Sequence, residues 1–244
     1  MKIIAIANQK GGTAKTTTVA ALGLLLSRQG TPVHMVDMDP QASLTHAFGH
    51  TDNPARTANP LLSADGLVTA TVAENLTLSP SPFQLSQVET DLLAEDGREH
   101  RLRMCLERTP LPADTVVLLD SPPSLGILAV NCLTVANGLI AVVQPGGFEL
   151  HALMQLQITV ESIRHRVNPH LQVLGAVVTN AHRRRRITGQ VERETAGLYR
   201  ILGTVRSDAR LLTASSTGRL HKLHRSSAMD DYAEVLRRLR TVMP

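Results

Sequence analysis

The chain has 244 residues, enough for one large α/β domain or two small ones, and no apolar run approaches the roughly 18 residues of a membrane-spanning helix. The net charge of +4 hides an asymmetry: residues 1–159 carry 9 Lys and Arg against 14 Asp and Glu, whereas residues 160–244 carry 16 against 7. A basic final third on an acidic remainder indicates a polyanionic partner for that third.

The start of the sequence and its two cysteines favour a reducing compartment. Met1 and Lys2 lead straight into an apolar run, so signal-peptide organisation is missing at the start of the sequence. Cys105 and Cys132 fall in predicted helices without metal-ligand spacing, and we interpret them as buried free thiols. We therefore expect a cytoplasmic protein.

A glycine-bearing turn separates two apolar runs near the N-terminus. Residues 3–7 are typical of a buried strand and residues 19–26 of a buried helix, and Lys10-Gly11-Gly12-Thr13-Ala14-Lys15-Thr16-Thr17 lies between them. A phosphate-binding loop needs this context, because the turn points backbone N–H groups into a concavity and the helix N-terminus adds a partial positive charge. Lys15 would reach the outer phosphates of a nucleotide, and the Thr16 hydroxyl would bind Mg²⁺.

The turn departs from the standard pattern G-x-x-x-x-G-K-[ST]. Its two glycine positions hold Gln9 and Ala14, and a second lysine, Lys10, stands five residues before Lys15. A non-glycine residue at positive φ costs about 1–2 kcal/mol. We therefore expect a negative φ at Ala14.

Two further apolar runs end in carboxylates. Residues 33–37 predict a strand that ends at Asp37, with Asp39 just beyond it, and residues 115–120 predict a strand that ends at Asp120. The carboxyl ends of parallel strands meet at one edge of a sheet, which is where α/β proteins bind ligands. We expect all three carboxylates near the glycine turn, where Asp120 would hold Mg²⁺ through water.

The rest of the chain predicts alternating strands and helices, with residues 50–66 as a loop. Expected strands are 67–72, 76–78, 138–143 and 171–180, and expected helices are 83–108, 150–167, 187–199 and 230–243. This alternation favours one doubly wound α/β domain over residues 1–244, a mostly parallel sheet with helices on both faces.

Three segments together resemble the deviant Walker A (ParA/MinD) ATPases, and among these the ParA/Soj partition ATPases. They are the run Ile-Ala-Ile-Ala-Asn-Gln-Lys-Gly-Gly, the Asp-x-Asp-Pro-Gln segment from Asp37, and the Asp-Ser-Pro-Pro segment from Asp120, in the family's order. The resemblance implies a P-loop NTPase that uses ATP and Mg²⁺, with slow, partner-stimulated hydrolysis.

The resemblance also implies roles for individual residues. Lys10 would reach the phosphates of the other subunit, Asp39 would position or activate the attacking water, and Asn180 would contact the base. The implied nucleotide-binding residues are Lys10, Gly11, Gly12, Thr13, Ala14, Lys15, Thr16, Thr17 and Asn180. The implied metal-site residues are Thr16, Asp37, Asp39 and Asp120, and the implied catalytic residues are Lys10, Lys15, Asp39 and Asp120.

The function implied by the resemblance is DNA partition. An ATP-bound sandwich homodimer would bind nucleoid DNA without sequence preference, and a ParB-like partner would stimulate hydrolysis and release it. The family's basic positions align with Arg184, Arg186, Arg206 and Arg210. Because the sequence starts at its first strand, we expect no N-terminal helix-turn-helix domain.

Three alternatives remain open at this stage. The same machinery positions other cargo, such as a microcompartment or a chemoreceptor cluster. A MinD-like membrane protein would need a C-terminal helix with a strong apolar face, and the helix expected at 230–243 is short and basic. A nitrogenase-type iron protein would need cluster-ligating cysteines beside glycines, which Cys105 and Cys132 do not provide.

Overall fold

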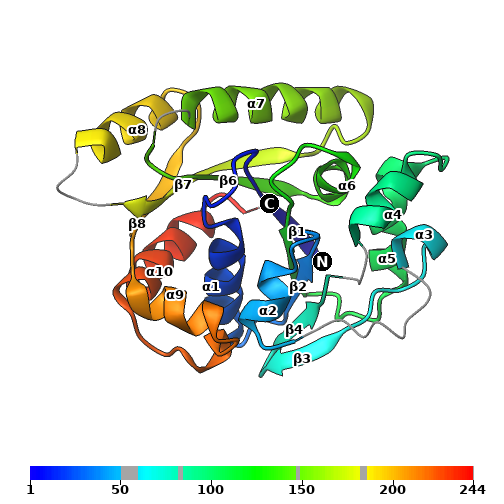
Figure 1. Ribbon diagram of the computed structural model, residues 1–244, viewed down its shortest axis with the longest axis horizontal. Coiled ribbons are helices and arrows are strands. Elements are labelled where there is room, and N and C mark those ends of the chain that lie inside the picture. The colour runs from blue at the N-terminus through cyan, green and yellow to red at the C-terminus, as the bar shows by residue number, and fades with distance from the viewer. Residues whose placement is uncertain (51–59, 82–84, 147–148, 182–185, 244) are drawn as a thin grey trace.

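The computed structural model describes residues 1–50, 60–81, 85–146, 149–181 and 186–243 (Figure 1). Its strands form one eight-stranded sheet in the order β3-β4-β2-β5-β1-β6-β7-β8. Every neighbouring pair is parallel except β3 and β4. The prediction of a doubly wound, mostly parallel sheet is confirmed.

The strands are β1 (Lys2–Ala7), β2 (Val33–Asp37), β3 (Ala70–Ala73), β4 (Leu76–Ser79), β5 (Val116–Asp120), β6 (Gly138–Val143), β7 (Gln172–Ala181) and β8 (Ile201–Arg206). The α-helices are α1 (Lys15–Ser27), α2 (Ser43–Ala47), α3 (Pro60–Ser63), α4 (Leu85–Leu92), α5 (Arg101–Arg108), α6 (Ile127–Val135), α7 (Glu149–Arg166), α8 (Arg186–Ala196), α9 (Ala209–Ser216) and α10 (Ser227–Leu239). Two short 3-10 helices lie at Arg98–His100 and Leu220–Lys222.

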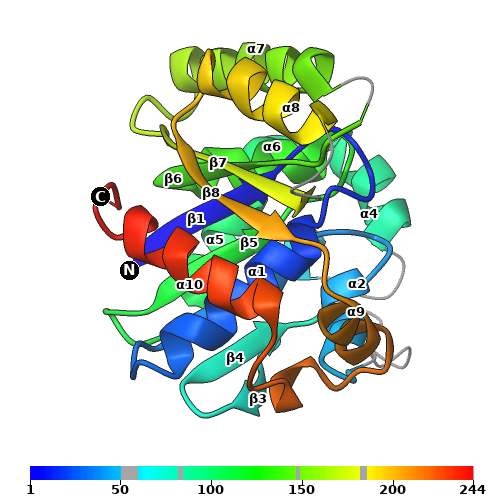
Figure 2. The same ribbon diagram turned by 90° about the vertical axis from the view of Figure 1, so that its left-hand side faces the viewer.

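The sheet separates two hydrophobic clusters. Alternate residues of β1 point to opposite faces, so Ile4 and Ile6 pack with α1 and α10, whereas Ile3 and Ala5 pack with α4 to α7. Helices therefore cover both faces (Figures 1 and 2). The central strands are mostly apolar because both of their faces are buried, and the exceptions include Lys2 at the exposed start of β1 and the buried His34 of β2.

The carboxyl edge of the sheet collects the residues expected to carry chemistry. Asp37 and Asp120 are register partners at the ends of β2 and β5, and Ile6 of β1 is the partner of Asp120 on the other side. The glycine turn follows β1 directly, so the turn and the two carboxylates converge on one edge.

Several predicted elements differ in the structure, including the loop expected at 50–66, in which α3 occupies Pro60–Ser63. The helix expected at 83–108 is divided into α4 and α5, with Gly97 in the left-handed conformation between them. Glycine adopts positive φ without steric cost, which allows this turn. The strand expected at 67–72 is β3, and it makes an antiparallel hairpin with β4 in which Asn75 has φ 55°.

Strand β8 and helix α9 were not predicted. The tail helix is also earlier than expected: α10 begins at Ser227, because the Ser226 side chain accepts a hydrogen bond from the backbone N–H of Met229. The apolar face of α10 is already used, since it packs on β8 and α1. Its buried residues are Ala228, Met229, Tyr232, Val235, Leu236 and Leu239.

Within the described residues, no helix is both long and apolar enough to cross a membrane. Cys105 and Cys132 are buried and free, as expected.

Candidate nucleotide site

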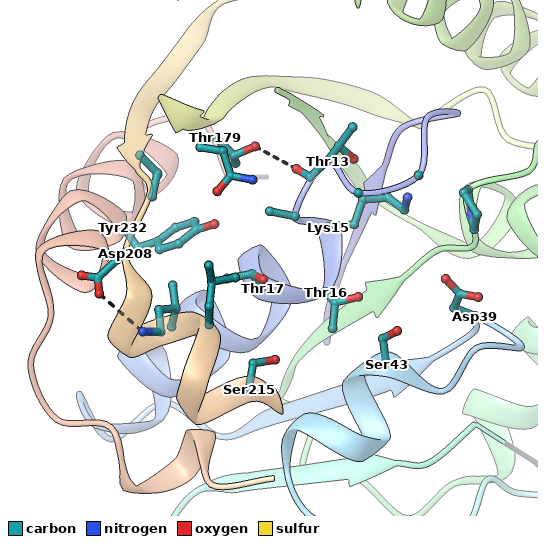
Figure 3. A pocket seen from close by; sticks show the side chains of 18 of the residues that line it. Thr13, Lys15, Thr16, Thr17, Asp39, Ser43, Thr179, Asp208, Ser215 and Tyr232 are labelled. Atoms are coloured by element: carbon teal, nitrogen blue, oxygen red, sulfur yellow. Dashed lines mark hydrogen bonds between the residues drawn. The ribbon is translucent and has the colours of Figure 1, made fainter. Parts of the chain in front are cut away.

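A pocket of about 420 Å³ opens at the carboxyl edge of the sheet, a size typical of small-molecule sites (Figure 3). In the close-up, Lys15 and Thr16 lie between Asp39 and Ser43 on one side and Asp208 and Tyr232 on the other. The lining residues are Gly11, Gly12, Thr13, Ala14, Lys15, Thr16, Thr17, Asp39, Gln41, Ser43, Pro123, Thr179, Asn180, Val205, Arg206, Asp208, Leu211, Leu212, Ser215 and Tyr232.

The glycine turn is fixed by side chains from neighbouring strands. The Asn8 amide donates to the carbonyl of Val142 in β6 and accepts a bond from the backbone N–H of Lys10 at 3.0 Å. The Thr179 hydroxyl of β7 donates to the Thr13 carbonyl at 2.8 Å. The turn is therefore held at both of its ends before any ligand arrives, which lowers the entropy cost of binding.

Lys15 is enclosed within the turn. Its Nζ donates to the Lys10 carbonyl at 3.3 Å, and the residue is only 6% exposed. Burial lowers the pKa of Lys15, while Asp120 and Asp39 oppose that shift. The ammonium is thus poorly solvated, and a phosphate oxygen would give it a stronger partner than a backbone carbonyl.

Ala14 has φ 65°, so the prediction of a negative φ at this position is wrong. Ala14 immediately precedes α1, and its carbonyl accepts from the N–H and the hydroxyl of Thr18 at 2.9 and 2.8 Å. Entering the helix from so tight a turn demands the left-handed conformation that glycine would adopt freely. The alanine therefore carries strain of about 1–2 kcal/mol.

Asp37 and Asp120 are both buried, but they differ in their partners. Asp37 accepts from the N–H and hydroxyl of Thr45 and from the N–H of Asp39. Neither carboxylate oxygen of Asp120 has a partner within normal hydrogen-bond geometry. Asp37 thus organises the segment after β2, whereas Asp120 is left for a ligand.

The electrostatics of Asp120 agree with that difference. Burial raises its pKa well above the ordinary value, the Asp37 charge adds to the rise, and the Thr16 hydroxyl and Lys15 oppose it. Burial also raises the pKa of Asp37, to about 6, against its hydrogen bonds. A cation beside Asp120 would remove the cost of keeping this carboxylate ionised.

The Thr16 hydroxyl and Asp120 fit a magnesium ion. In the described part of the chain, no group of three or more His, Cys, Asp or Glu residues forms a metal site by itself. Mg²⁺ does not require one, because it keeps several waters and takes one or two protein oxygens with phosphate oxygens. The orphaned oxygens of Asp120 supply such a ligand, direct or through water.

The far end of the pocket is built from β7, β8, α9 and α10. Asn180 has φ 48°, and its amide donates to the Gln144 side chain at 3.0 Å. Asp208 caps α9 by accepting from the N–H of Arg210, and Tyr232 bonds the Thr18 hydroxyl at 2.9 Å. We missed Asp208 in the sequence, although it follows β8 by two residues just as Asp39 follows β2.

The four arginines expected to contact DNA have different surroundings. Arg206 lines the pocket and forms a two-pronged ion pair with Asp231, at 2.7 Å for Nη2 and 2.8 Å for Nε. Arg210 is exposed on α9. Arg186 is the first residue of α8, and Arg184 lies outside the described residues.

A strand, a tight turn, a buried lysine and an orphaned carboxylate at one sheet edge define a P-loop nucleotide-binding protein. Residues 1–173 match the AAA domain family. The chain is 36% identical over 200 residues to the chromosome partitioning protein ParA of Caulobacter vibrioides, covering 80% of this chain and 75% of that one. It is 35% identical over 204 residues to the sporulation initiation inhibitor protein Soj of Bacillus subtilis, covering 82% and 80%.

Among solved structures, cobyrinic acid a,c-diamide synthase from Mycobacterium smegmatis, with a bound ATP analogue and magnesium, aligns with a TM-score of 0.82. It is 31% identical, and the alignment covers 96% of this chain and 92% of that one. Sequence relatives and fold agree, and the chain belongs to the ParA/Soj family of partition ATPases.

Replacing Ala14 by glycine should stabilise the nucleotide-free protein. Relief of the left-handed strain exceeds the extra entropy of the unfolded chain, so we expect a gain of about 1 kcal/mol and a rise in Tm of about 2–4 °C. Thermal unfolding measures this. The matched control is Ala233→Gly, an exposed position within α10, which should cost about 1 kcal/mol. If both variants lose stability alike, Ala14 carries no strain.

Proposed function

We propose that this protein is an ATP-dependent DNA-partition ATPase, cytoplasmic and associated with the nucleoid. The observation that carries the proposal is the position of α9. Leu211, Leu212 and Ser215 of this helix line the nucleotide pocket. The same helix leads into a basic segment, residues 219–225. Helix α9 therefore connects the candidate nucleotide pocket to this basic segment, which would bind a polyanion.

Residues of the pocket divide the work of binding and hydrolysing ATP. The backbone N–H groups of Gly11 to Thr17 and the Lys15 ammonium would hold the phosphates. Thr16 and Asp120 would hold Mg²⁺, which offsets charge on the phosphate oxygens during transfer. Asp39 lies on the pocket wall after β2, where it would orient the attacking water. Lys10 would complete the site of a second subunit in an ATP-bound sandwich dimer.

The basic segment supports DNA binding without sequence preference. Between Asp208 and Asp230 the chain has no acidic residue. The exposed cations of this stretch are Arg210 on α9 and Arg219, Lys222 and Arg225 in the basic segment. Contacts of such side chains to phosphates give affinity that falls steeply with salt. Arg206 already has Asp231 as a partner, so we expect it to contribute less than Arg210. The contacts of Arg184 and Arg186 with DNA remain predictions.

The partners proposed here are a second copy of the chain, double-stranded DNA and a ParB-like protein that stimulates hydrolysis. Cargo other than DNA would use the same machinery. Membrane association of the MinD type is disfavoured, because the apolar face of α10 is packed against β8 and α1. ATP turnover that depends on a small carboxylic acid and an ammonia source would instead favour a synthase.

The two lysines of the turn should fail differently when replaced by alanine. Lys15→Ala should lose nucleotide binding, because its ammonium lies inside the turn, where it would reach the phosphates. Lys10→Ala should bind ATP but lose ATP-dependent dimerisation and hydrolysis. Calorimetry with ATP, size-exclusion chromatography and phosphate release measure the three properties. Normal hydrolysis by Lys10→Ala would refute the proposed role of Lys10.

DNA binding should depend on nucleotide and salt. If a monomer contacts about three phosphates and a dimer about six, the slope of log affinity against log salt should double on dimerisation. We expect duplexes of unrelated sequence to bind strongly with ATP, weakly with ADP and not at moderate salt. Fluorescence anisotropy with ATP, ADP and no nucleotide measures this.

Arginine variants test which surface binds the DNA. Arg210→Ala with Arg219→Ala should weaken binding to all duplexes and leave ATP-driven dimerisation intact. Arg237→Ala, whose guanidinium is paired with Glu234, should bind DNA like the wild type. Equally tight DNA binding without nucleotide would rule out control of DNA binding by ATP. Binding to one DNA sequence only would rule out the proposed sequence-independent contact with phosphates.

A further inference from the structure

Two glycines that follow helix ends touch each other. Gly49 follows α2 and Gly218 follows α9, with φ of 74° and 67°. A Cβ on Gly49 would lie 2.9 Å from the Gly218 carbonyl oxygen, and a Cβ on Gly218 would lie 2.9 Å from the Gly49 Cα. Both distances are below any that real Cβ atoms show, so backbone meets backbone with no room for a side chain. Helices α2 and α9 lie side by side in Figure 2.

On one side of this contact, α2 is tied to the segment that follows β2. The N–H and hydroxyl of Thr45 donate to Asp37 at 2.8 and 2.7 Å, and Ser43 at the start of α2 lines the pocket. Asp39 lines the same wall. Helix α2 is therefore linked to the pocket wall that holds Asp39 and Ser43.

On the other side, α9 joins the pocket to the basic segment. Asp208 accepts bonds from the start of α9 and from Ser227 and Ala228 of α10. These bonds lower the pKa of Asp208 below its ordinary value, against the effect of partial burial. The start of α9 is thus anchored, and Gly218, two residues after its end, leads into the cations at 219–225.

We propose that the Gly49–Gly218 contact transmits the nucleotide state of the pocket to the basic segment 219–225. The inference rests on the proposed function, since it explains how ATP would regulate DNA binding. Packed backbone has no flexible side chain to absorb a displacement, so a small shift of α2 is passed to Gly218 rather than dissipated. The contact thereby couples the wall holding Asp39 to the basic surface within one subunit, in addition to any effect of dimerisation.

The test replaces Gly218 by alanine and compares it with Gly97→Ala. Gly97 also has a positive φ, 63°, but nothing lies within 4 Å of its added Cβ, so the control carries the same backbone strain without the clash. The readouts are ATP affinity, ATP-driven dimerisation and the ratio of DNA affinities with ATP and with ADP. Gly218→Ala should keep ATP binding and dimerisation, while the ratio falls about tenfold, within the usual range of coupling between sites. Gly97→Ala should keep the ratio.

A second measurement compares the wild type with Gly218→Ala. The experiment is run without DNA and at low protein concentration. Amide hydrogen exchange of the wild-type protein should then change on ATP binding both at the end of α2 and at residues 217–225. A wild-type ratio in Gly218→Ala, or unchanged exchange at 217–225, would overturn the contact's role. Because α9 itself lines the pocket, the decisive comparison is with Gly218→Ala, in which the ATP-dependent change at 217–225 should shrink, and an undiminished change there would also overturn the contact's role. Wild-type protein that shows no ATP-dependent DNA binding would refute the proposed function instead.

Discussion

The site depends on a carboxylate that the fold encloses without giving it a partner. Asp120 is 0% exposed and neither oxygen makes a hydrogen bond of normal geometry, although the Thr16 hydroxyl lies close enough to lower its pKa, and such burial costs free energy unless a cation or a proton compensates it. The sheet imposes this position, because β5 lies between β1 and β2 and ends beside the turn. Lys15, Thr16 and Asp37 are arranged around it, and the arrangement is incomplete until a ligand brings positive charge.

The two halves of the pocket follow from different parts of the chain. The phosphate half is local in sequence, since β1, the turn and α1 are consecutive. The other half needs β8, α9 and α10 to return to α1, where Tyr232 meets Thr18 across 214 positions. Through this return the basic third of the chain becomes one wall of the nucleotide pocket, which links the two properties that the sequence presents separately.

The residues at the ends of the buried strands could be predicted from the sequence. Apolar runs ending in Asp37 and Asp120 predicted the sheet edge correctly, because buried parallel strands are nearly continuous in apolar residues. The sequence did not predict the φ of Ala14, which the geometry of the turn into α1 sets although the two are adjacent in the chain. It also did not predict the pairing of Arg206 with Asp231, which lie 25 positions apart. Strand β8 was not predicted, because its glycine, threonine and arginine interrupt the apolar pattern.

The most direct test is calorimetry of ATP binding with Mg²⁺ and with EDTA, on the wild type and on Asp120→Asn. If Asp120 is the metal-site carboxylate, Mg²⁺ should tighten ATP binding to the wild type, and that gain should vanish in the variant. Without ligand, the same variant should be more stable by about 1–3 kcal/mol, because an amide is cheaper to bury than an unpartnered carboxylate. An undiminished Mg²⁺ effect in Asp120→Asn would contradict this account of the site.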